Sequence, residues 1–199
     1  MNKILLLLLV SWQLSAIEVL TEARVGYFLP TNDKFKDMYG EDGIIGSVES
    51  SFKAWNNLYP WANISFYANA GHAGEDHKKT HIYFIPIGAG LKYMYPFEHF
   101  SVYGGVGVLP TYLHIKNDSH FLVRTQEKWG CGGVAKVGFI SNKIWNFFLD
   151  LFAEYSYINI HFHKKSNQAL NPAILSNFTI GGGIGYHFGC KNCKNEDDN

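Results

Sequence analysis

Charged side chains recur inside stretches of the sequence where apolar and polar residues alternate. Residues two apart share a face of an extended strand, so Glu22 lies on the same face as Arg24, and Asp150 on the same face as Glu154. The phase of each stretch predicts that these charges point away from the apolar face. The residues predicted to lie there are Glu22, Arg24, Glu49, Lys53, Lys92, Lys136, Asp150 and Glu154.

This set could serve as an ion or proton path, as a gate, or as a closed network of salt bridges. Its acidic and basic members are equal in number. Because an isolated charge in a narrow interior is very costly, equal numbers favour the closed network. We therefore predict a structural role for the set and no catalytic residue in it.

Histidine-rich segments are the candidates for a metal site. One contains His72, Glu75, Asp76, His77 and His81, and another contains His161 and His163. A metal site needs three or four ligands in fixed geometry. Both segments fall at or in predicted connections, where polar side chains are usually solvated. We therefore predict no metal and no cofactor.

Two other motifs lack the context that their chemistry requires. Cys190 and Cys193 lie in a polar tail, without the strand-to-helix context of a redox site or the further ligands of a zinc site. They are predicted to form a small disulfide or to be free thiols. Residues 181–185 are glycine-rich, but no helix follows to hold a phosphate. These glycines are predicted to make room for aromatic side chains of neighbouring strands.

The segment that ends at Phe188 shows the clearest alternation. One face carries Phe178, Ile180, Ile184, Tyr186 and Phe188, and the other carries Thr179, Gly181, Gly183, Gly185 and His187. An apolar face that ends in aromatic residues, opposite a face of small or polar residues, is typical of a strand between lipid and a narrow polar interior. This segment is predicted to close a membrane barrel.

Seven more alternating segments precede it, at residues 21–29, 44–55, 61–71, 82–95, 100–115, 127–140 and 147–161. Eight is the smallest strand number of bacterial outer-membrane barrels. We therefore predict an all-β fold, an eight-stranded antiparallel up-and-down transmembrane β-barrel.

The connections between these segments alternate in length. Those at 30–43, 72–81, 116–126 and 162–173 are long and polar, whereas those at 56–60, 96–99 and 141–144 are short. Transmembrane barrels have long outer loops and short periplasmic turns, so both chain ends are predicted to be periplasmic. Aromatic residues near the short turns predict a girdle there: Trp55, Tyr59, Trp61, Tyr93, Tyr95, Phe97, Phe100, Trp145, Phe147 and Phe148.

Composition and the N-terminus limit the class further. The chain has 17 basic and 17 acidic residues, so it has no basic field to attract nucleic acid. A positive start, an apolar run at 4–10 and small residues at 15–16 are typical of a secretory signal peptide. The predicted organisation is a signal peptide at 1–16, a barrel at 17–188 and a polar periplasmic tail at 189–199.

Several segments resemble those of small bacterial outer-membrane β-barrels of the OmpX, OmpW and OmpA-membrane-domain type. The matching segments are residues 22–28, 35–40, 86–93, 103–107 and 181–188. The resemblance implies an outer-membrane location, and recognition of the strand that ends at Phe188 by the barrel-assembly machinery. The tail after Phe188 is a departure, since many members end at that aromatic residue.

Two other functions stay open. Lipid A deacylases are also eight-stranded barrels, and His163 and Ser166 resemble their histidine and serine, although a spacing of three puts the two on opposite faces of a regular strand. A soluble lipocalin-like carrier would have apolar residues inside and charges outside. The favoured prediction is a monomeric, non-enzymatic barrel whose outer loops contact lipopolysaccharide, neighbouring proteins or host surfaces.

Overall fold

Alternating residues form antiparallel strands in the computed structural model, which describes residues 18–32, 36, 42–73, 78–117, 125–141, 145–160 and 173–189. The strands are β1 Val19–Pro30, β2 Gly43–Phe52, β3 Leu58–Ala73, β4 Lys78–Pro96, β5 Phe100–Val108, β6 Thr111–Asn117, β7 Thr125–Ser141, β8 Phe147–Ile160 and β9 Ala173–Phe188. The predicted signal peptide and the tail cysteines lie outside the described residues. No helix in the described part of the chain is long and apolar enough to cross a membrane.

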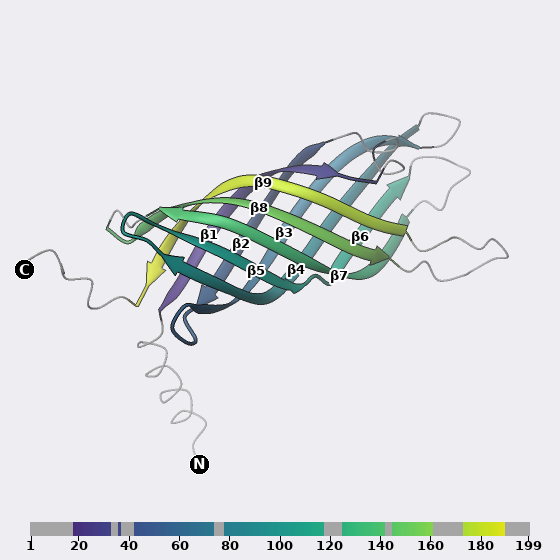
Figure 1. Ribbon diagram of the computed structural model, residues 1–199. Coiled ribbons are helices and arrows are strands. Elements are labelled where there is room, and N and C mark those ends of the chain that lie inside the picture. Colours follow the sequence, from purple (N-terminus) through teal and green to yellow (C-terminus); the bar gives the residue numbers. More distant parts are fainter. Residues whose placement is uncertain are drawn as a thin grey trace, which may run out of the picture.

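The sheet closes on itself into a barrel (Figure 1). β1 pairs with β2 and also with β9, where Val19 lies opposite Phe188. The remaining strands follow in chain order around the wall, so that each has a neighbour on both sides. Closure removes the unpaired edges of a sheet, which a membrane cannot satisfy. The predicted fold class, an antiparallel up-and-down barrel, is confirmed.

The fifth predicted strand is divided into β5 and β6 at Pro110, which has no amide hydrogen to donate to a ladder. Both parts lie between β4 and β7. The wall continues through the break, because the Leu109 amide donates to the Gly132 carbonyl at 2.9 Å and the Ile87 amide donates to the Pro110 carbonyl at 2.8 Å. The nine strands therefore occupy eight positions around the barrel.

The two ends of the barrel differ. Val19, Phe188 and the turns after β2, β4 and β7 lie at one end, here called the terminus end; the opposite end is the loop end (Figure 1). One predicted long connection is wrong: β3 and β4 stay paired as far as Ala73 and Lys78, so residues 74–77 alone join them. Backbone pairing does not require apolar side chains, and this polar segment therefore extends the hairpin.

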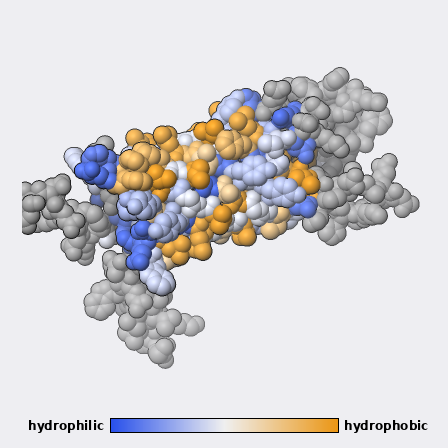
Figure 2. All heavy atoms as spheres, viewed as in Figure 1, coloured by the Kyte–Doolittle hydropathy of each residue, from blue (hydrophilic) through white to orange (hydrophobic). Residues whose placement is uncertain are grey.

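The outward face of the wall is apolar and the inward face carries the charges. Leu91, Leu151 and Ile184 are 49%, 62% and 60% exposed, whereas the neighbouring Lys92 and Asp150 are each 1% exposed. Apolar side chains cover much of the middle of the face seen in Figure 2, and exposed apolar residues on the other strands, such as Val25, Ile64 and Ile87, continue this surface as an apolar belt. A soluble carrier would show the reverse, so this arrangement overturns the lipocalin-like alternative.

Apolar side chains fill the interior on both sides of its centre. The layer toward the terminus end consists of Leu20, Tyr59, Met94, Tyr103, Ile140 and Phe148; Phe152, which follows Asp150 along β8, belongs to the same cluster. The layer toward the loop end consists of Phe28, Trp61, Tyr67, Ile82, Phe84, Leu109, Leu113, Val134, Ile158, Ile160 and Leu175. An eight-stranded barrel is just wide enough to be filled by side chains. The inward charges therefore lie between two apolar layers.

The aromatic girdle at the terminus end is present but smaller than predicted. Outward members include Trp55, Tyr93, Tyr95, Phe97, Trp145 and Phe147. Tyr59, Trp61 and Phe148 are wrongly assigned, because they have the inward phase of their strands and are buried. Aromatic rings also lie toward the loop end, where the ring centroids of Tyr112 and Trp129 are 5.3 Å apart; the sequence-based prediction included no girdle there.

Candidate functional site

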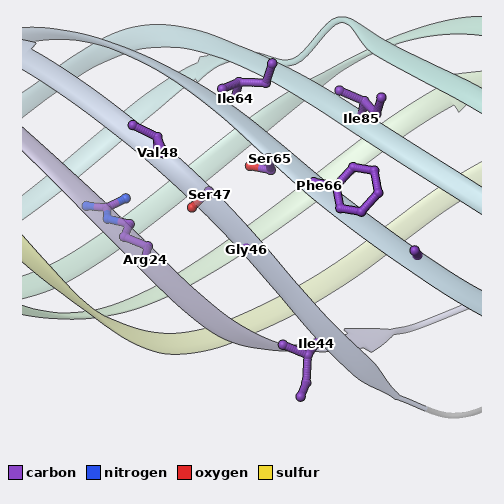
Figure 3. A pocket seen from close by; sticks show the side chains of 10 residues that line it. Arg24, Ile44, Gly46, Ser47, Val48, Ile64, Ser65, Phe66 and Ile85 are labelled. Carbon is purple, nitrogen blue, oxygen red and sulfur yellow. The ribbon is translucent and has the colours of Figure 1, made fainter.

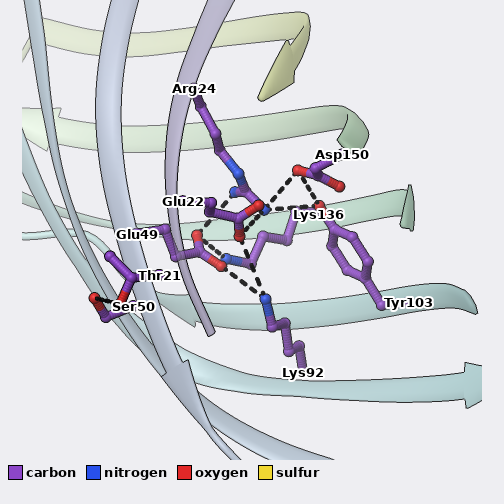
Figure 4. A network of polar contacts seen from close by, with 9 residues as sticks. All are labelled: Thr21, Glu22, Arg24, Glu49, Ser50, Lys92, Tyr103, Lys136 and Asp150. Atoms are coloured by element: carbon purple, nitrogen blue, oxygen red, sulfur yellow. Dashed lines mark hydrogen bonds and ion pairs between the residues drawn. The ribbon is translucent and has the colours of Figure 1, made fainter. Parts of the chain in front are cut away.

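Arg24 on β1 lies at the centre of the inward charges (Figure 4). Its Nη1 is 2.8 Å from Glu49 Oε2, and its Nη2 is 2.7 Å from Glu22 Oε1 and 2.9 Å from Asp150 Oδ2. All four side chains are at most 1% exposed. Because a buried guanidinium is stable only with partners, the three carboxylates from β1, β2 and β8 hold Arg24 across the interior.

Two lysines complete the cluster from the other side of the barrel. Lys92 Nζ on β4 is 3.2 Å from Glu49 Oε1 and 3.6 Å from Glu22 Oε1. Lys136 Nζ on β7 donates to Glu49 Oε2 at 2.5 Å. Glu49 therefore contacts three cations. The six residues Glu22, Arg24, Glu49, Lys92, Lys136 and Asp150 are called the central charge network below.

The set predicted from the sequence also contains Lys53 and Glu154, which are not part of the central charge network. Lys53 follows the last residue of β2, its side chain is 44% exposed, and its Nζ lies 3.7 Å from Glu18 Oε2 at the terminus end. Its assignment to the buried set is therefore wrong, because the strand ends before it. Glu154 is partly buried and lies opposite Lys136 in the register of β7 and β8.

Aromatic side chains that were not among the candidate site residues surround the central charge network. Arg24 Nη2 donates to the Tyr103 hydroxyl at 2.9 Å, and that hydroxyl donates to Asp150 Oδ2 at 3.2 Å. Lys136 Nζ is 3.2 Å from the centroid of the Trp61 ring. Such rings stabilise desolvated cations. Their inward strand phase was the signal that could have identified them.

Glycines on neighbouring strands make room for these rings. A Cβ atom at Gly90 would lie 2.9 Å from the Trp61 ring, and one at Gly181 would lie 2.9 Å from Phe152. A Cβ atom at Gly138 would overlap the Tyr103 ring, and one at Gly185 would overlap Phe148. The sequence-based prediction that glycines of the last strand admit aromatic rings is confirmed for Gly181 and Gly185.

Replacing Gly138 with alanine is therefore expected to displace Tyr103 and to lower the free energy of unfolding by about 1–3 kcal/mol. The matched control is Gly104→Ala on β5, where a Cβ atom meets nothing within 4 Å. Urea unfolding of both variants in lipid vesicles measures the difference. Equal stability of the two would show that Gly138 does not position Tyr103.

The network is suited to closing the interior. Its three cations and three carboxylates balance formally, and clusters of buried apolar side chains lie on both sides of it along the strands. Among the described residues, no group of three or more histidine, cysteine, aspartate and glutamate side chains could hold a metal ion. His163 and Ser166, which resemble the deacylase pair, lie outside the described residues.

A closed barrel with an apolar outer belt and buried charges is the architecture of a membrane-spanning β-barrel. Solved structures share it. The chain is similar to the outer membrane protein OprG from Pseudomonas aeruginosa, with a TM-score of 0.61 and 14% identity over 87% of this chain and 96% of that one. It is also similar to Neisserial surface protein A, with a TM-score of 0.59 and 12% identity over 87% and 97% of the two chains.

The Escherichia coli outer membrane protein W has a TM-score of 0.54 and 15% identity over 87% of this chain and 98% of that one. No protein-family model matches the chain, and a comparison with curated protein sequences gave no match. At these identities the likeness shows the fold, which is that of the small outer-membrane β-barrels. Together with the apolar belt, the fold places the protein in the bacterial outer membrane.

Proposed function

We propose that the protein is a non-enzymatic outer-membrane barrel with a closed interior, and that it acts at the cell surface through the connections at its loop end. The observation that carries this proposal is the position of the central charge network between two apolar layers. A conducting pore needs a continuous water-filled path, whereas the network is itself buried and has large buried apolar side chains on both sides of it along the strands. The interior therefore serves as a rigid support.

The connections supply the second argument. Residues 31–42, 74–77, 118–124 and 161–172 join strands at the loop end, and all of these except 74–77 are longer than the segments 53–57, 97–99 and 142–146 at the terminus end. Barrels of this class expose their longer connections outside the cell. The longer segments are rich in polar and charged residues, which suits contacts with lipopolysaccharide or with a host or neighbouring surface.

With the loop end outside the cell, the orientation of the barrel also bears on the barrel-assembly machinery and on the oligomeric state. The terminus end then faces the periplasm, so the strand that ends at Phe188 is available to the barrel-assembly machinery as the chain inserts. Because the wall is closed by pairing of β1 with β9 within one chain, the protein needs no second copy to complete the barrel. We propose that it functions as a monomer.

Exchange of the outer connections tests this function. A variant in which residues 31–42 and 161–172 are replaced by short glycine–serine turns is expected to fold and to lose binding to lipopolysaccharide vesicles and host-cell surfaces. Heat-dependent mobility on a gel measures folding, and a pull-down measures binding. The matched control replaces the turn at 53–57.

Two results would contradict the proposal. Undiminished binding by the variant with short outer connections would exclude these segments as the interaction surface. Steady ion conductance of the intact wild-type protein in planar bilayers would show that ions pass the central charge network and that the interior is not closed.

A further inference from the structure

Basic residues gather near the loop end of β3, β4 and β6, which are neighbours in the sheet. Their positions fall on the outward face, because they are an even number of residues from the exposed Phe66 on β3 and Tyr83 on β4, and because Lys116 on β6 is itself exposed. The residues at these positions, called the basic band below, are His72, Lys79, His81, His114 and Lys116.

The register makes the positions of the basic band neighbours of one another. His81 lies opposite Lys116, and His72 lies opposite Lys79. Lys79 and Lys116 are therefore diagonal partners on β4 and β6. Diagonal positions on paired strands are about 7–8 Å apart, which allows two long side chains to reach the same group. Because neighbouring cations repel each other, this placement favours an anion that both lysines contact.

One carboxylate borders the basic band on the described part of the wall. Glu127 on β7 is 62% exposed, and its Oε1 lies 3.5 Å from Nδ1 of His114. Lys116 is exposed and forms no ion pair with any residue that the structure describes. With every histidine neutral, two lysines against one glutamate still leave a net positive charge on this part of the outward face.

The outward face changes in character along these strands. Toward the middle of the wall it is apolar, with Ile64 and Phe66 on β3 and Ile85 on β4 (Figure 3). The Tyr83 ring follows toward the loop end, with its centroid 6.0 Å from that of the His114 ring. The basic band comes last, next to the ends of β4 and β6. Since aromatic rings mark the membrane interface, this order puts the basic band at the level of the lipid headgroups.

Other strands carry different residues at this level. The outward positions near the loop end of β1, β8 and β9 hold Tyr27, Leu29, Tyr155, Tyr157, Asn159, Ile174 and Ser176. In these described segments no outward position is basic. General attraction to anionic headgroups would favour cations all around the wall. Confinement of the basic residues to three neighbouring strands therefore indicates one bound group.

The level in the membrane and the charge together indicate the ligand. In the orientation of the proposed function, on which this inference rests, the loop end meets the outer leaflet, whose lipopolysaccharide carries phosphate groups on the sugars of its lipid A. Phosphate oxygens are strong acceptors, and lysine binds them as a point charge. We propose that the basic band, with Lys79 and Lys116 as its cations, binds a phosphate group of lipid A.

Removal of the two lysines tests the proposal. Lys79→Met/Lys116→Met is compared with wild type and with the control Lys53→Met/Lys143→Met, which removes the same charge at the terminus end. Each full-length mature protein is refolded in mild detergent, checked by heat-dependent mobility, and titrated with lipid A in native mass spectrometry. The loop-end variant is expected to bind about 25-fold more weakly, roughly fivefold for each lysine, and the control to bind as wild type does.

Lipid A with the same acyl chains but without phosphate gives the second comparison. Wild type is expected to bind it as weakly as the loop-end variant binds intact lipid A, because either change removes the same contact. Equal binding of both lipids by wild type, or an equal loss in the control, would overturn the proposal. So would equal binding of phosphatidylglycerol, which would indicate any anionic lipid, or displacement by inorganic phosphate, which would indicate a free anion.

This measurement does not depend on the outer connections, because lipid A lacks the outer saccharide chain of lipopolysaccharide. The variant with short connections at 31–42 and 161–172 keeps β4 and β6, so it is expected to bind lipid A as wild type does. Loss of surface binding in that variant and loss of lipid A binding in the loop-end variant are therefore separate results, and either proposal can fail alone.

Discussion

Replacement of Glu49 by alanine is expected to lower the free energy of unfolding by about 3–5 kcal/mol. The Glu49 carboxylate contacts Arg24, Lys92 and Lys136, and its side chain is fully buried. Without it, the three cations share only the remaining carboxylates in a space closed to water, and the uncompensated charge is costly. Urea unfolding of the protein refolded into lipid vesicles, followed by tryptophan fluorescence, measures the loss.

An exposed glutamate provides the control. Glu127 is 62% exposed and lies 3.5 Å from His114, so Glu127→Ala is expected to change the stability by no more than about 1 kcal/mol. Glu49→Gln keeps the shape of the side chain and removes its charge, and it separates the effect of charge from that of volume. Equal losses for Glu49→Ala and Glu127→Ala would show that the central charge network does not stabilise the barrel.

The stability lost in Glu49→Ala is the cost of breaking the network, and it does not measure how much the intact network contributes to the stability of the barrel. Buried ion pairs often stabilise no more than apolar side chains of the same volume would. Once Arg24 and the two lysines are inside, however, each needs its carboxylate. The register shows this dependence, because Glu22 lies directly opposite Glu49. Like charges in that position repel, and Arg24 and Lys92, which contact both, offset the repulsion.

Alternation in the sequence predicts which residues face inward, because the period of two is a property of the extended backbone. It does not predict which inward residues meet. That depends on the register and on the path of the wall, which brings Lys92 on β4 and Lys136 on β7 to the same carboxylate on β2. The sequence therefore indicates the members of the network but not the central position of Glu49.

The errors have related causes. Closeness to a turn predicts Trp61 in the girdle, yet its strand phase directs it inward over Lys136. Lys53 has the inward phase but follows the end of β2. The sequence does not predict the extension of β3 and β4, because side-chain polarity indicates where lipid ends and not where backbone pairing ends. Strand phase is thus more informative than position along the chain, but only within the bounds of the strand.

Arginine in place of Leu151 is expected to destabilise the protein in lipid vesicles by about 2–4 kcal/mol, the cost of a charged side chain at the middle of a bilayer. Leu151 is 62% exposed and lies on the outward face of β8, midway between Phe147 and Tyr155. On the surface of a water-soluble protein, the same change at an exposed leucine would alter stability by no more than about 0.5 kcal/mol. The variant therefore tests whether this face contacts hydrocarbon.

Trp145→Arg supplies the comparison at the rim. Trp145 lies in the turn before β8 and is 92% exposed, so an arginine there reaches water and headgroups and is expected to cost no more than about 1 kcal/mol. Urea unfolding of both variants in vesicles gives the difference. A small effect at both positions would show that Leu151 does not contact lipid. Leu149 and Ile184 on the same face would then also face water, and the surface would not be a membrane belt. If only the change at Leu151 has a large effect, the middle of the wall is surrounded by hydrocarbon, where a charge is costly, and the end of the wall by water and headgroups, where it is not.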